Sequence, residues 1–286
     1  MTTRVAIVSG ASSGIGEATA RWLQNIGYTV YAAARRVERM EPLTELGIRP
    51  VSVDLTDDPS MVGLVDRVIE ETGLVDVLVN NAGYASYGAI EDVTLDEARR
   101  QFDVNLFGLA RLVQLVLPHM RSQRSGHIVN ISSIYGRMTA PLGGWYHASK
   151  HAVEGLSDSL RMELAPFDIR VVLIEPGPIR TEWSAIATNG LVLTSGTGAY
   201  AGQAATVAKV MASSVENPGL GSSPDVIARA VAKAVTSRRP RARYVVGTGA
   251  RPMLFARRHL SDRAFDRLTE VAFRVVSQRS DRAAQP

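Results

Sequence analysis

Short apolar runs rich in β-branched residues alternate along this chain with longer segments of helical periodicity. The segments with helical spacing include residues 17–26, 61–71 and 96–121. Helical segments of about 10 to 15 residues between strands are typical of βαβ units, in which neighbouring strands run parallel. The pattern predicts an α/β fold whose parallel strands lie at residues 5–9, 29–34, 50–53, 75–79, 127–131, 170–174 and 244–246.

A glycine-rich turn directly follows the first predicted strand. Gly10, Gly14 and Gly16 stand in a Gly-x-x-x-Gly-x-Gly pattern, and a helix begins behind them. Glycine lets the backbone approach a phosphate closely, and the N-terminus of a helix attracts anions. The spacing differs from the Gly-x-Gly-x-x-Gly of the commoner dinucleotide fingerprint. Strand, turn and helix together predict a nucleotide phosphate site.

Two arginines stand at the end of the second predicted strand, where a dinucleotide fold meets the adenosine ribose. An acidic residue at this place binds the 2′-hydroxyl of NAD, whereas arginine accommodates the 2′-phosphate of NADP. The chain has Ala34, Arg35 and Arg36 here and no carboxylate. We therefore predict NADP(H) in preference to NAD(H). The alternative is that both arginines are exposed loop charges.

Polar or glycine-containing turns follow the other predicted strands. Ligands of parallel α/β sheets bind outside the carboxyl ends of the strands. We therefore expect these turns to line one site, with Asp54 placed to meet the adenine. The turns are Asp54-Leu55, Asn80-Asn81-Ala82-Gly83, Ser132-Ser133 and Glu175-Pro176-Gly177-Pro178-Ile179-Arg180-Thr181.

Tyr146 and Lys150 stand one turn apart in a segment that predicts the start of a helix, which places both side chains on one face. A tyrosine has an ordinary pKa of about 10, too high for ready proton exchange near neutrality. A cation nearby lowers that pKa, as acid–base chemistry requires. The alternative is a solvated pair on a helix surface.

These motifs together resemble those of the short-chain dehydrogenase/reductase family in its single-domain form. The match covers roughly residues 4–182 and, more loosely, 224–247. The resemblance implies one NAD(P)-binding domain over residues 1–286, with a Rossmann-like, doubly wound sheet of about seven parallel strands flanked by helices and a C-terminal helical extension. The motifs that carry it are Gly10-x-x-x-Gly14-x-Gly16, Asn80-Asn81-Ala82-Gly83, Asn105, Ser133, Tyr146-x-x-x-Lys150 and Pro176-Gly177, in that order.

The resemblance also implies the reaction, which is the interconversion of a carbonyl and a secondary alcohol with Tyr146 as general acid and base. Lys150 would lower the pKa of Tyr146 and hold the nicotinamide ribose, and Ser133 would hydrogen-bond the substrate oxygen. Ser133, rather than Ser132, lies 13 residues before Tyr146, as the active serine does in the family. Asn105 would anchor a water that links Lys150 to solvent; the alternative is that this mid-helix asparagine bonds neighbouring backbone.

The family's cofactor pattern agrees with the two arginines. Members that use NAD carry an acidic residue 18 positions after the third glycine, where this chain has Ala34, and Arg35 follows as in many NADPH-using members. Ser13 stands where some NADPH users carry a basic residue before the second glycine. Arg35, together with Arg36, would therefore carry the discrimination.

The remaining cofactor contacts are carried over position by position. Asp54 would contact adenine, and Asn80 with Gly83 would line the adenine pocket. The implied cofactor-binding residues are Gly10, Ser12, Ser13, Gly14, Ile15, Gly16, Arg35, Arg36, Asp54, Leu55, Asn81, Ala82, Gly83, Tyr146, Lys150, Pro176, Gly177, Ile179 and Thr181.

Composition excludes several other classes of function. The chain has no cysteine, which removes disulfides, zinc–thiolate sites and cysteine nucleophiles, and we predict no metal site. Arg4 already begins an apolar strand, which leaves no room for a signal peptide. No apolar run reaches the ~18 residues that a membrane span needs, so we expect a cytoplasmic protein. The net charge is +4, with arginines concentrated between 238 and 263; because aromatic residues are not interleaved there, we expect a solvated basic surface rather than a nucleic-acid or acidic-membrane site.

Two segments lie beyond the motif-bearing part. Residues 182–223 correspond by position to the family's substrate loop, with helical spacing over 199–215. A second predicted helix covers residues 225–236. Four apolar residues belong either to the substrate wall or to the ordinary core: Met138, Leu142, Trp145 and Trp183.

The C-terminal extension, residues 250–286, carries an apolar stripe at helical spacing, with Phe265 beside it. We expect this helix to pack on its own domain or on another subunit, ahead of a membrane surface. Its length resembles the hydroxysteroid- and retinol-type branches of the family, which favours a lipophilic substrate. The stripe consists of Leu260, Ala264, Leu268, Val271 and Val275.

We therefore predict an NADP(H)-dependent oxidoreductase that acts on a small-molecule carbonyl or alcohol, with no nucleic-acid partner. The family favours a homo-oligomer, either a dimer or a tetramer. The alternative is a non-catalytic NADP(H)-binding sensor or interaction protein, since such relatives keep the glycine turn but lose the tyrosine or the lysine. Asn105, Ser133, Tyr146 and Lys150 are all present, which favours the enzyme.

Overall fold

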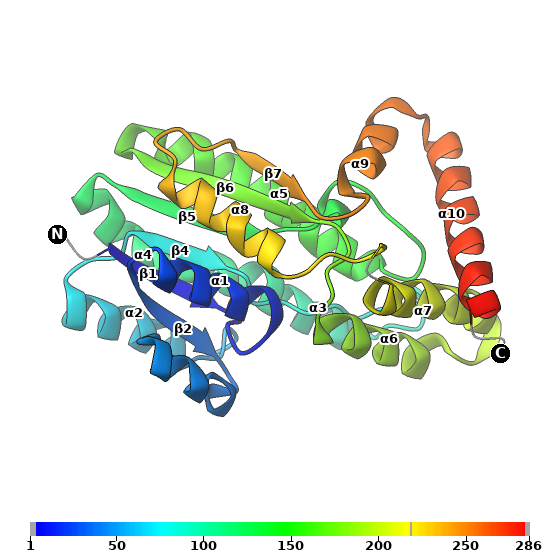
Figure 1. The fold of residues 1–286 in the computed structure, drawn as a ribbon, viewed down its shortest axis with the longest axis horizontal. Coiled ribbons are helices and arrows are strands. Elements are labelled where there is room, and N and C mark those ends of the chain that lie inside the picture. The colour runs from blue at the N-terminus through cyan, green and yellow to red at the C-terminus, as the bar shows by residue number, and fades with distance from the viewer. Residues whose placement is uncertain (1–3, 218, 284–286) are drawn as a thin grey trace.

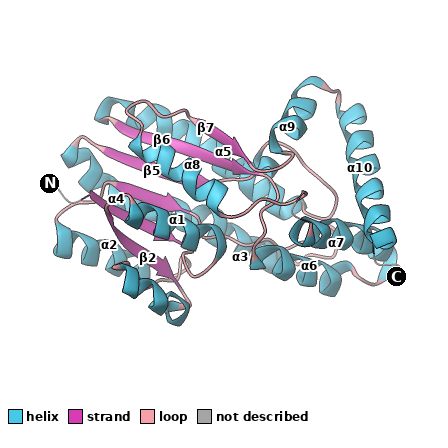
Figure 2. Ribbon diagram, viewed as in Figure 1, coloured by secondary structure: helices cyan, strands magenta, loops and turns pink. Residues whose placement is uncertain are grey.

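The computed structural model describes residues 4–217 and 219–283. Its central layer is a parallel sheet of seven strands in the order β3-β2-β1-β4-β5-β6-β7, which Figure 2 shows between two layers of helices. This order confirms the predicted doubly wound, Rossmann-like fold. The strands are β1 (Arg4–Ser9), β2 (Tyr28–Ala34), β3 (Arg49–Ser52), β4 (Val77–Asn80), β5 (Gly126–Ile131), β6 (Ile169–Pro176) and β7 (Arg243–Val246).

Helices cover both faces of the sheet (Figure 1). On one face α1 packs side by side with α8, and on the other face α2, α4 and α5 form the second layer. Because both faces are covered, the strands are apolar on both sides rather than alternating with polar residues. The bounds are α1 (Gly14–Asn25), α2 (Asp58–Thr72), α4 (Leu109–Gln123), α5 (Gly144–Leu164) and α8 (Asp225–Thr236).

Strand β1 shows how its residues divide between the two cores. Ala6 and Val8 point into the core beneath α1 and α8, whereas Val5 and Ile7 point into the core beneath α2 and α4. All four are completely buried, and burying a valine or isoleucine side chain contributes about 1.5–3 kcal/mol. The alternation follows from the two-residue period of a strand.

The helix predicted over residues 96–121 contains a wider turn in its middle. It begins as α3 (Leu95–Phe102), where the Thr94 side chain accepts a hydrogen bond from the Glu97 backbone N–H at 3.2 Å. It then passes through a π-helical turn, η2 (Asp103–Gly108), and continues as α4. Asn105 stands in this wider turn, a feature that is frequent at functional sites. The 3₁₀ segments of the described chain are η1 (Val37–Leu46), η3 (Ile134–Gly136), η4 (Ala165–Phe167) and η5 (Gly198–Tyr200).

The segment expected as a substrate loop is largely helical. The predicted helix over 199–215 is present as α7 (Ala201–Glu216), but it is preceded by α6 (Glu182–Ser195), which the sequence did not predict. The buried positions of α6 are mostly small or polar, namely Ser184, Ala187, Leu191 and Ser195. For this reason the sequence of α6 has no amphipathic pattern. The buried face of this helix is identified by its contact with α7.

The C-terminal extension forms two helices that arch away from the sheet and return to α7 (Figure 1). In α9 (Ala250–His259) and α10 (Asp262–Ala283), Phe265 packs with Met138 and Leu254, and Phe273 joins the cluster that contains α6 and α7. Packing on its own domain, the first of the predicted alternatives, is therefore observed. No helix of the described residues is both long and apolar enough to cross a membrane.

The face of α10 that packs inward differs from the predicted stripe. Leu268, Val271 and Val275 are exposed, whereas Phe265 and Thr269 are buried. Two apolar rows lie side by side on this helix, and helical spacing alone does not distinguish the row that meets a partner. The predicted stripe is therefore not the row that packs on the domain.

Candidate active site

One cleft runs along the carboxyl ends of the strands, with a volume of about 590 Å³. It is lined by Ser133 and by the residues predicted to contact the cofactor, with the exceptions of Gly16 and Asn80. Gly16 lies behind the wall and packs against the Gly10 backbone instead. Among the described residues no group of three or more His, Asp or Glu side chains is arranged to hold a metal ion.

The glycine turn brings three segments of the cleft wall together. Gly10 has a φ of +66°, and a Cβ there would lie 2.7 Å from the Cα of Ala82. Gly14 has a φ of +58°, and a Cβ there would lie 2.9 Å from Thr181 Cγ2. Any larger residue at these two positions meets both an unfavourable backbone conformation and a neighbouring segment.

The start of α1 is open toward the cleft. Ser13 occupies the position that would cap the helix, yet within the described chain its side chain makes no capping hydrogen bond. The first N–H groups of a helix have no partner inside the helix and carry its positive dipole end. Ser13, Gly14 and Ile15 therefore form a cradle that fits the diphosphate of a dinucleotide.

Arg35 and Arg36 follow β2 and are exposed at the end of the cleft beside Asp54. Neither arginine forms an ion pair with any described residue, so both guanidinium groups are available to an anionic ligand. The Thr56 backbone N–H bonds Asp54 and lowers the pKa of that carboxyl, and the charge of Arg35 lowers it further. The two arginines and two carboxylates, Asp54 and Glu182, therefore set the charge of this part of the wall, and Glu182 is already paired with Arg39 at 2.7 Å.

The two asparagines after β4 have different roles. Asn81 lines the cleft, and its amide donates to the Ser9 and Gly10 carbonyls at 3.0 and 3.1 Å, which fixes the glycine turn. Asn80 is 2% exposed and donates to the Asn130 side chain at 2.9 Å inside the sheet. The expectation that Asn80 lines the adenine pocket is therefore wrong, because its side chain points to the strand β5 instead.

Tyr146 and Lys150 share one face of α5 and both line the cleft, as predicted from their spacing. The Lys150 Nζ donates to the Ile131 carbonyl at 2.9 Å. Burial lowers the pKa of Lys150 to about 8, and the nearby Glu154 carboxylate raises it in part. Burial also raises the pKa of Tyr146 above its ordinary value, and hydrogen bonding with Ser133 opposes this effect. Burial is the largest effect on the Tyr146 phenol, and the lowering of its pKa by Lys150 that the family resemblance implies stays a prediction.

Ser133 and Asn105 support this pair from two directions. Ser133 lines the cleft, and its Oγ accepts a hydrogen bond from the Tyr135 backbone N–H at 3.1 Å. Asn105 lies beneath the cleft, where its side chain accepts from the Tyr84 N–H at 3.0 Å and donates to the Tyr84 carbonyl at 2.9 Å. It also donates to Ser149 Oγ at 3.1 Å. Asn105 therefore holds the wall to the helix that carries Lys150.

Aromatic side chains surround the Tyr146 phenol. The Trp183 ring lies 5.3 Å from the Tyr146 ring, and the Tyr87 and Tyr135 rings lie at 6.0 and 6.4 Å. Trp183 therefore lines the cleft, in agreement with the first of its two predicted alternatives, the substrate wall and the ordinary core. The other three residues of that set belong to the core or the helix surface and do not line the cleft, namely Met138, Leu142 and Trp145.

Several wall residues were not predicted. Tyr84, Tyr87 and Tyr135 each follow a strand end by a few residues, so their position in the chain could have indicated them. The residues from α6 and α7 had no such signal, because they reach the cleft only through tertiary packing. These are Glu182, Ser184, Ile186, Ala187, Val210, Met211 and Ser214.

Comparisons with known proteins agree with this geometry. The family model described as short chain dehydrogenase matches residues 4–190. A 3-ketodihydrosphingosine reductase of Bacteroides thetaiotaomicron is 38% identical over 248 residues, covering 86% of this chain and 89% of its own. An NADPH-dependent 3-dehydrocapnine reductase of Ornithobacterium rhinotracheale is 34% identical over 287 residues, covering 97% of this chain and 100% of its own.

A solved structure shows the same fold over the whole length. The crystal structure of a short-chain dehydrogenase from Streptomyces avermitilis has a TM-score of 0.77, 32% sequence identity and 100% coverage of both chains. The family model covers well over half of the chain, and two relatives above 30% identity match most of it. The chain therefore belongs to the short-chain dehydrogenase/reductase family of oxidoreductases.

Proposed function

We propose that the protein is an NADP(H)-dependent oxidoreductase that interconverts a carbonyl and a secondary alcohol, with Tyr146 as general acid and base. The observation that carries this proposal is the position of Tyr146. Its phenol lines the same cleft as the open start of α1 and the two free arginines after β2. A proton donor and a dinucleotide cradle therefore share one site.

The cofactor is held, in this proposal, by residues whose chemistry suits each of its parts. The α1 cradle takes the diphosphate, Arg35 and Arg36 take the 2′-phosphate, and Lys150 takes the nicotinamide ribose. When bound, NADPH supplies the hydride that a carbonyl carbon accepts. The presence of Ala34 in place of a carboxylate supports NADP(H) over NAD(H), since position 34 itself carries no charge that repels a phosphate.

Tyr146 supplies the proton in the reductive direction. Because burial keeps its phenol protonated at neutral pH, the O–H is available to the carbonyl oxygen as negative charge develops there. Ser133 donates a second hydrogen bond to the same oxygen. The Lys150 ammonium favours the phenolate that remains, and a proton from solvent restores the phenol. Oxidation of the alcohol follows the same steps in reverse.

The wall around Tyr146 supports a lipophilic substrate. Trp183, Tyr87, Ile186 and Met211 contribute mostly apolar surface beside the phenol, and no arginine or lysine other than Lys150 faces this end of the described cleft. The two relatives named above are both reductases, one of them NADPH-dependent. We infer that the natural substrate presents its carbonyl to Tyr146 and an apolar portion to α6 and α7.

NADPH consumption measured across steroid, retinoid, acyl-thioester, sugar and small aromatic carbonyls tests the proposal. We expect turnover with apolar ketones and greater efficiency with NADPH than with NADH. Tight NADPH binding without turnover of any compound would favour the non-catalytic sensor instead. Efficient turnover with NADH alone would overturn the cofactor assignment.

A further inference from the structure

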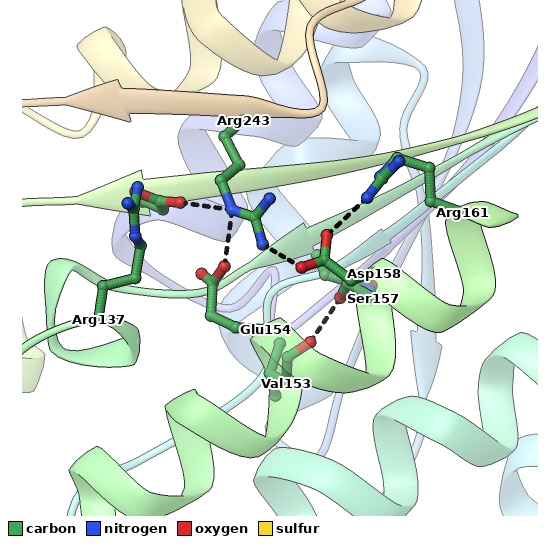
Figure 3. A network of polar contacts seen from close by, with 9 residues as sticks. Arg137, Val153, Glu154, Ser157, Asp158, Arg161 and Arg243 are labelled. Atoms are coloured by element: carbon green, nitrogen blue, oxygen red, sulfur yellow. Dashed lines mark hydrogen bonds and ion pairs between the residues drawn. The ribbon is translucent and has the colours of Figure 1, made fainter.

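A network of charged side chains connects α5 with β6 and β7 (Figure 3), and two of its carboxylates, Glu154 and Glu175, are buried. The Arg243 guanidinium from β7 binds Glu154 at 3.0 Å, Asp158 at 2.7 Å and Glu175 at 3.1 Å. Arg137 approaches the second oxygen of Glu175 at 3.4 Å. Charged side chains are rarely buried without a reason, because removal from water costs several kcal/mol for each ion.

Glu154 is the member of this network that faces the active site. It stands one turn after Lys150 on α5, so both side chains project from the same face. A Cβ built at Gly136 would lie 2.7 Å from Ser132 Oγ, 2.9 Å from Glu154 Cγ and 3.1 Å from the Lys150 carbonyl. The Glu154 side chain therefore lies close to both Ser132 and the backbone of Lys150.

The groups around Lys150 leave Glu154 as its source of negative charge. From β5 the Ile131 carbonyl accepts from Nζ, and from α5 the Tyr146 ring lies 5.9 Å from Nζ. From η2, Asn105 contributes a neutral amide near the same place. Of the described side chains that carry a charge, Glu154 is the one that acts on the Lys150 ammonium.

The groups around Glu154 decide its own charge. Burial raises the pKa of Glu154, whereas the Ser132 hydroxyl and the guanidinium groups of Arg243 and Arg137 lower it. Glu175 from β6 lies on the other side of Arg243, and burial raises its pKa to about 7, with the Glu154 charge adding to the effect. The guanidinium groups of Arg243 and Arg137 therefore favour the ionised form of Glu154 and oppose the effect of its burial.

We propose that Glu154, held by Arg243, is a positioning residue for Lys150, whose negative charge keeps this buried side chain an ammonium at neutral pH. The catalytic consequence rests on the proposed function: Lys150 can favour the Tyr146 phenolate only while Lys150 is charged. The proposal assigns a role in the reaction to a carboxylate that does not touch the cleft.

The composition of the chain makes a direct test simple. Lys150, Lys209 and Lys233 are its three lysines, and the last two are exposed. With ¹³C-labelled lysine, the three ε-carbon signals can be titrated by NMR in the full-length protein, without substrate or cofactor. Glu154→Gln keeps the side-chain shape and removes the charge, whereas Asp158→Asn removes another Arg243 partner and serves as the matched control.

In the wild type we expect Lys150 to titrate near the pKa of about 8 that burial gives it. In E154Q its pKa should fall by roughly one unit, with Lys209 and Lys233 unchanged. D158N should leave Lys150 where it is. Glu154→Ala offers a second route if E154Q does not fold, since it removes the same negative charge and should move Lys150 in the same direction.

Three results would overturn the proposal: a wild-type Lys150 with an ordinary pKa, an unchanged Lys150 in E154Q, or an equal shift in D158N. Turnover supplies a second readout, because the alkaline limb of the activity profile should move to lower pH in E154Q. If the wild type turns over no carbonyl, the proposed function fails, yet the NMR titration still decides the role of Glu154.

Discussion

The Nζ of Lys150 lies 5.9 Å from the centre of the Tyr146 ring, one turn further along α5. Its nearest hydrogen-bond partner is the Ile131 carbonyl rather than the phenol. Lys150 and Tyr146 therefore lie side by side in the cleft wall without a direct hydrogen bond between them. Burial sets the resting state of both groups, a protonated phenol and an ammonium whose pKa is reduced.

Tyr146→Phe should remove catalysis and leave the cofactor site intact. Loss of a general acid typically lowers turnover by about 10²–10⁴-fold. We expect NADPH affinity, measured by fluorescence titration, to stay within a few-fold of the wild type. Tyr87→Phe is the matched control, since it removes a buried phenol from the same wall but should retain activity. Comparable losses in both variants would show that Tyr146 acts only as packing.

Arg35→Asp should shift the preference from NADPH toward NADH. A carboxylate at this place repels the 2′-phosphate and accepts a hydrogen bond from a 2′-hydroxyl. The measurement is the ratio of kcat/KM for the two cofactors. Arg67→Asp, which makes the same charge change on the exposed part of α2, should leave the ratio unchanged. An R35D protein with wild-type selectivity would contradict the assignment.

The chemistry at the strand ends could be predicted from the sequence because it depends on local order. The glycine turn, Asp54, Asn81 and Ser133 each follow a strand directly, and parallel strands bring their carboxyl ends together. Asn80 illustrates the limit of this reasoning. It is adjacent to Asn81, yet the alternation of a strand turns its side chain into the sheet, toward Asn130.

The remaining parts of the site depend on packing that no short segment encodes. Helix α6 buries small and polar residues, so its contribution to the wall has no periodic signal. The inward face of α10 is set by α7 and η3 rather than by its own apolar spacing. The raised pKa of Tyr146 likewise follows from enclosure by Trp183 and Tyr87, which come from distant segments.

Phe273→Ala should loosen the substrate wall through α7. Phe273 is partly buried in the cluster that contains Met211 and Val207, so its loss should lower the free energy of unfolding by roughly 1–3 kcal/mol. We expect KM for bulky apolar ketones to rise while NADPH affinity is retained. Val271→Ala, on the exposed row of the same helix, should change stability by less than about 0.5 kcal/mol. Equal effects of the two substitutions would contradict this packing.

Glu175→Gln should change how stability depends on pH. The pKa of Glu175 is raised from 4.5 to about 7 in the folded chain. Between these values the folded chain binds more protons than the unfolded chain, so this carboxyl lowers the free energy of unfolding as pH rises through that range. Glutamine does not titrate, so E175Q should gain up to about 3 kcal/mol relative to wild type from pH 4.5 to 7.5.

Urea unfolding at a series of pH values measures this difference. Asp168→Asn, at an exposed carboxylate after η4, is the control and should follow the wild-type profile. Parallel profiles for E175Q and wild type would show that Glu175 is already ionised in the folded protein. In that case Arg243 would lie between two ionised carboxylates, Glu175 and Glu154.

Gly14→Ala tests the cradle at the start of α1 separately from the reaction. The residue has a φ of +58°, and a methyl group there would lie 2.9 Å from Thr181 Cγ2, so the turn must move. We expect NADPH affinity to fall by about tenfold or more, since a shift of the cradle misaligns the N–H groups toward the diphosphate. Gly155→Ala in α5 is the control, because a Cβ there meets nothing within 4 Å, and alanine should stabilise the helix by about 0.5–1 kcal/mol. Equal NADPH affinity in G14A and G155A would indicate that the diphosphate binds elsewhere in the cleft. The assignment of Ser13, Gly14 and Ile15 to the diphosphate would then be wrong.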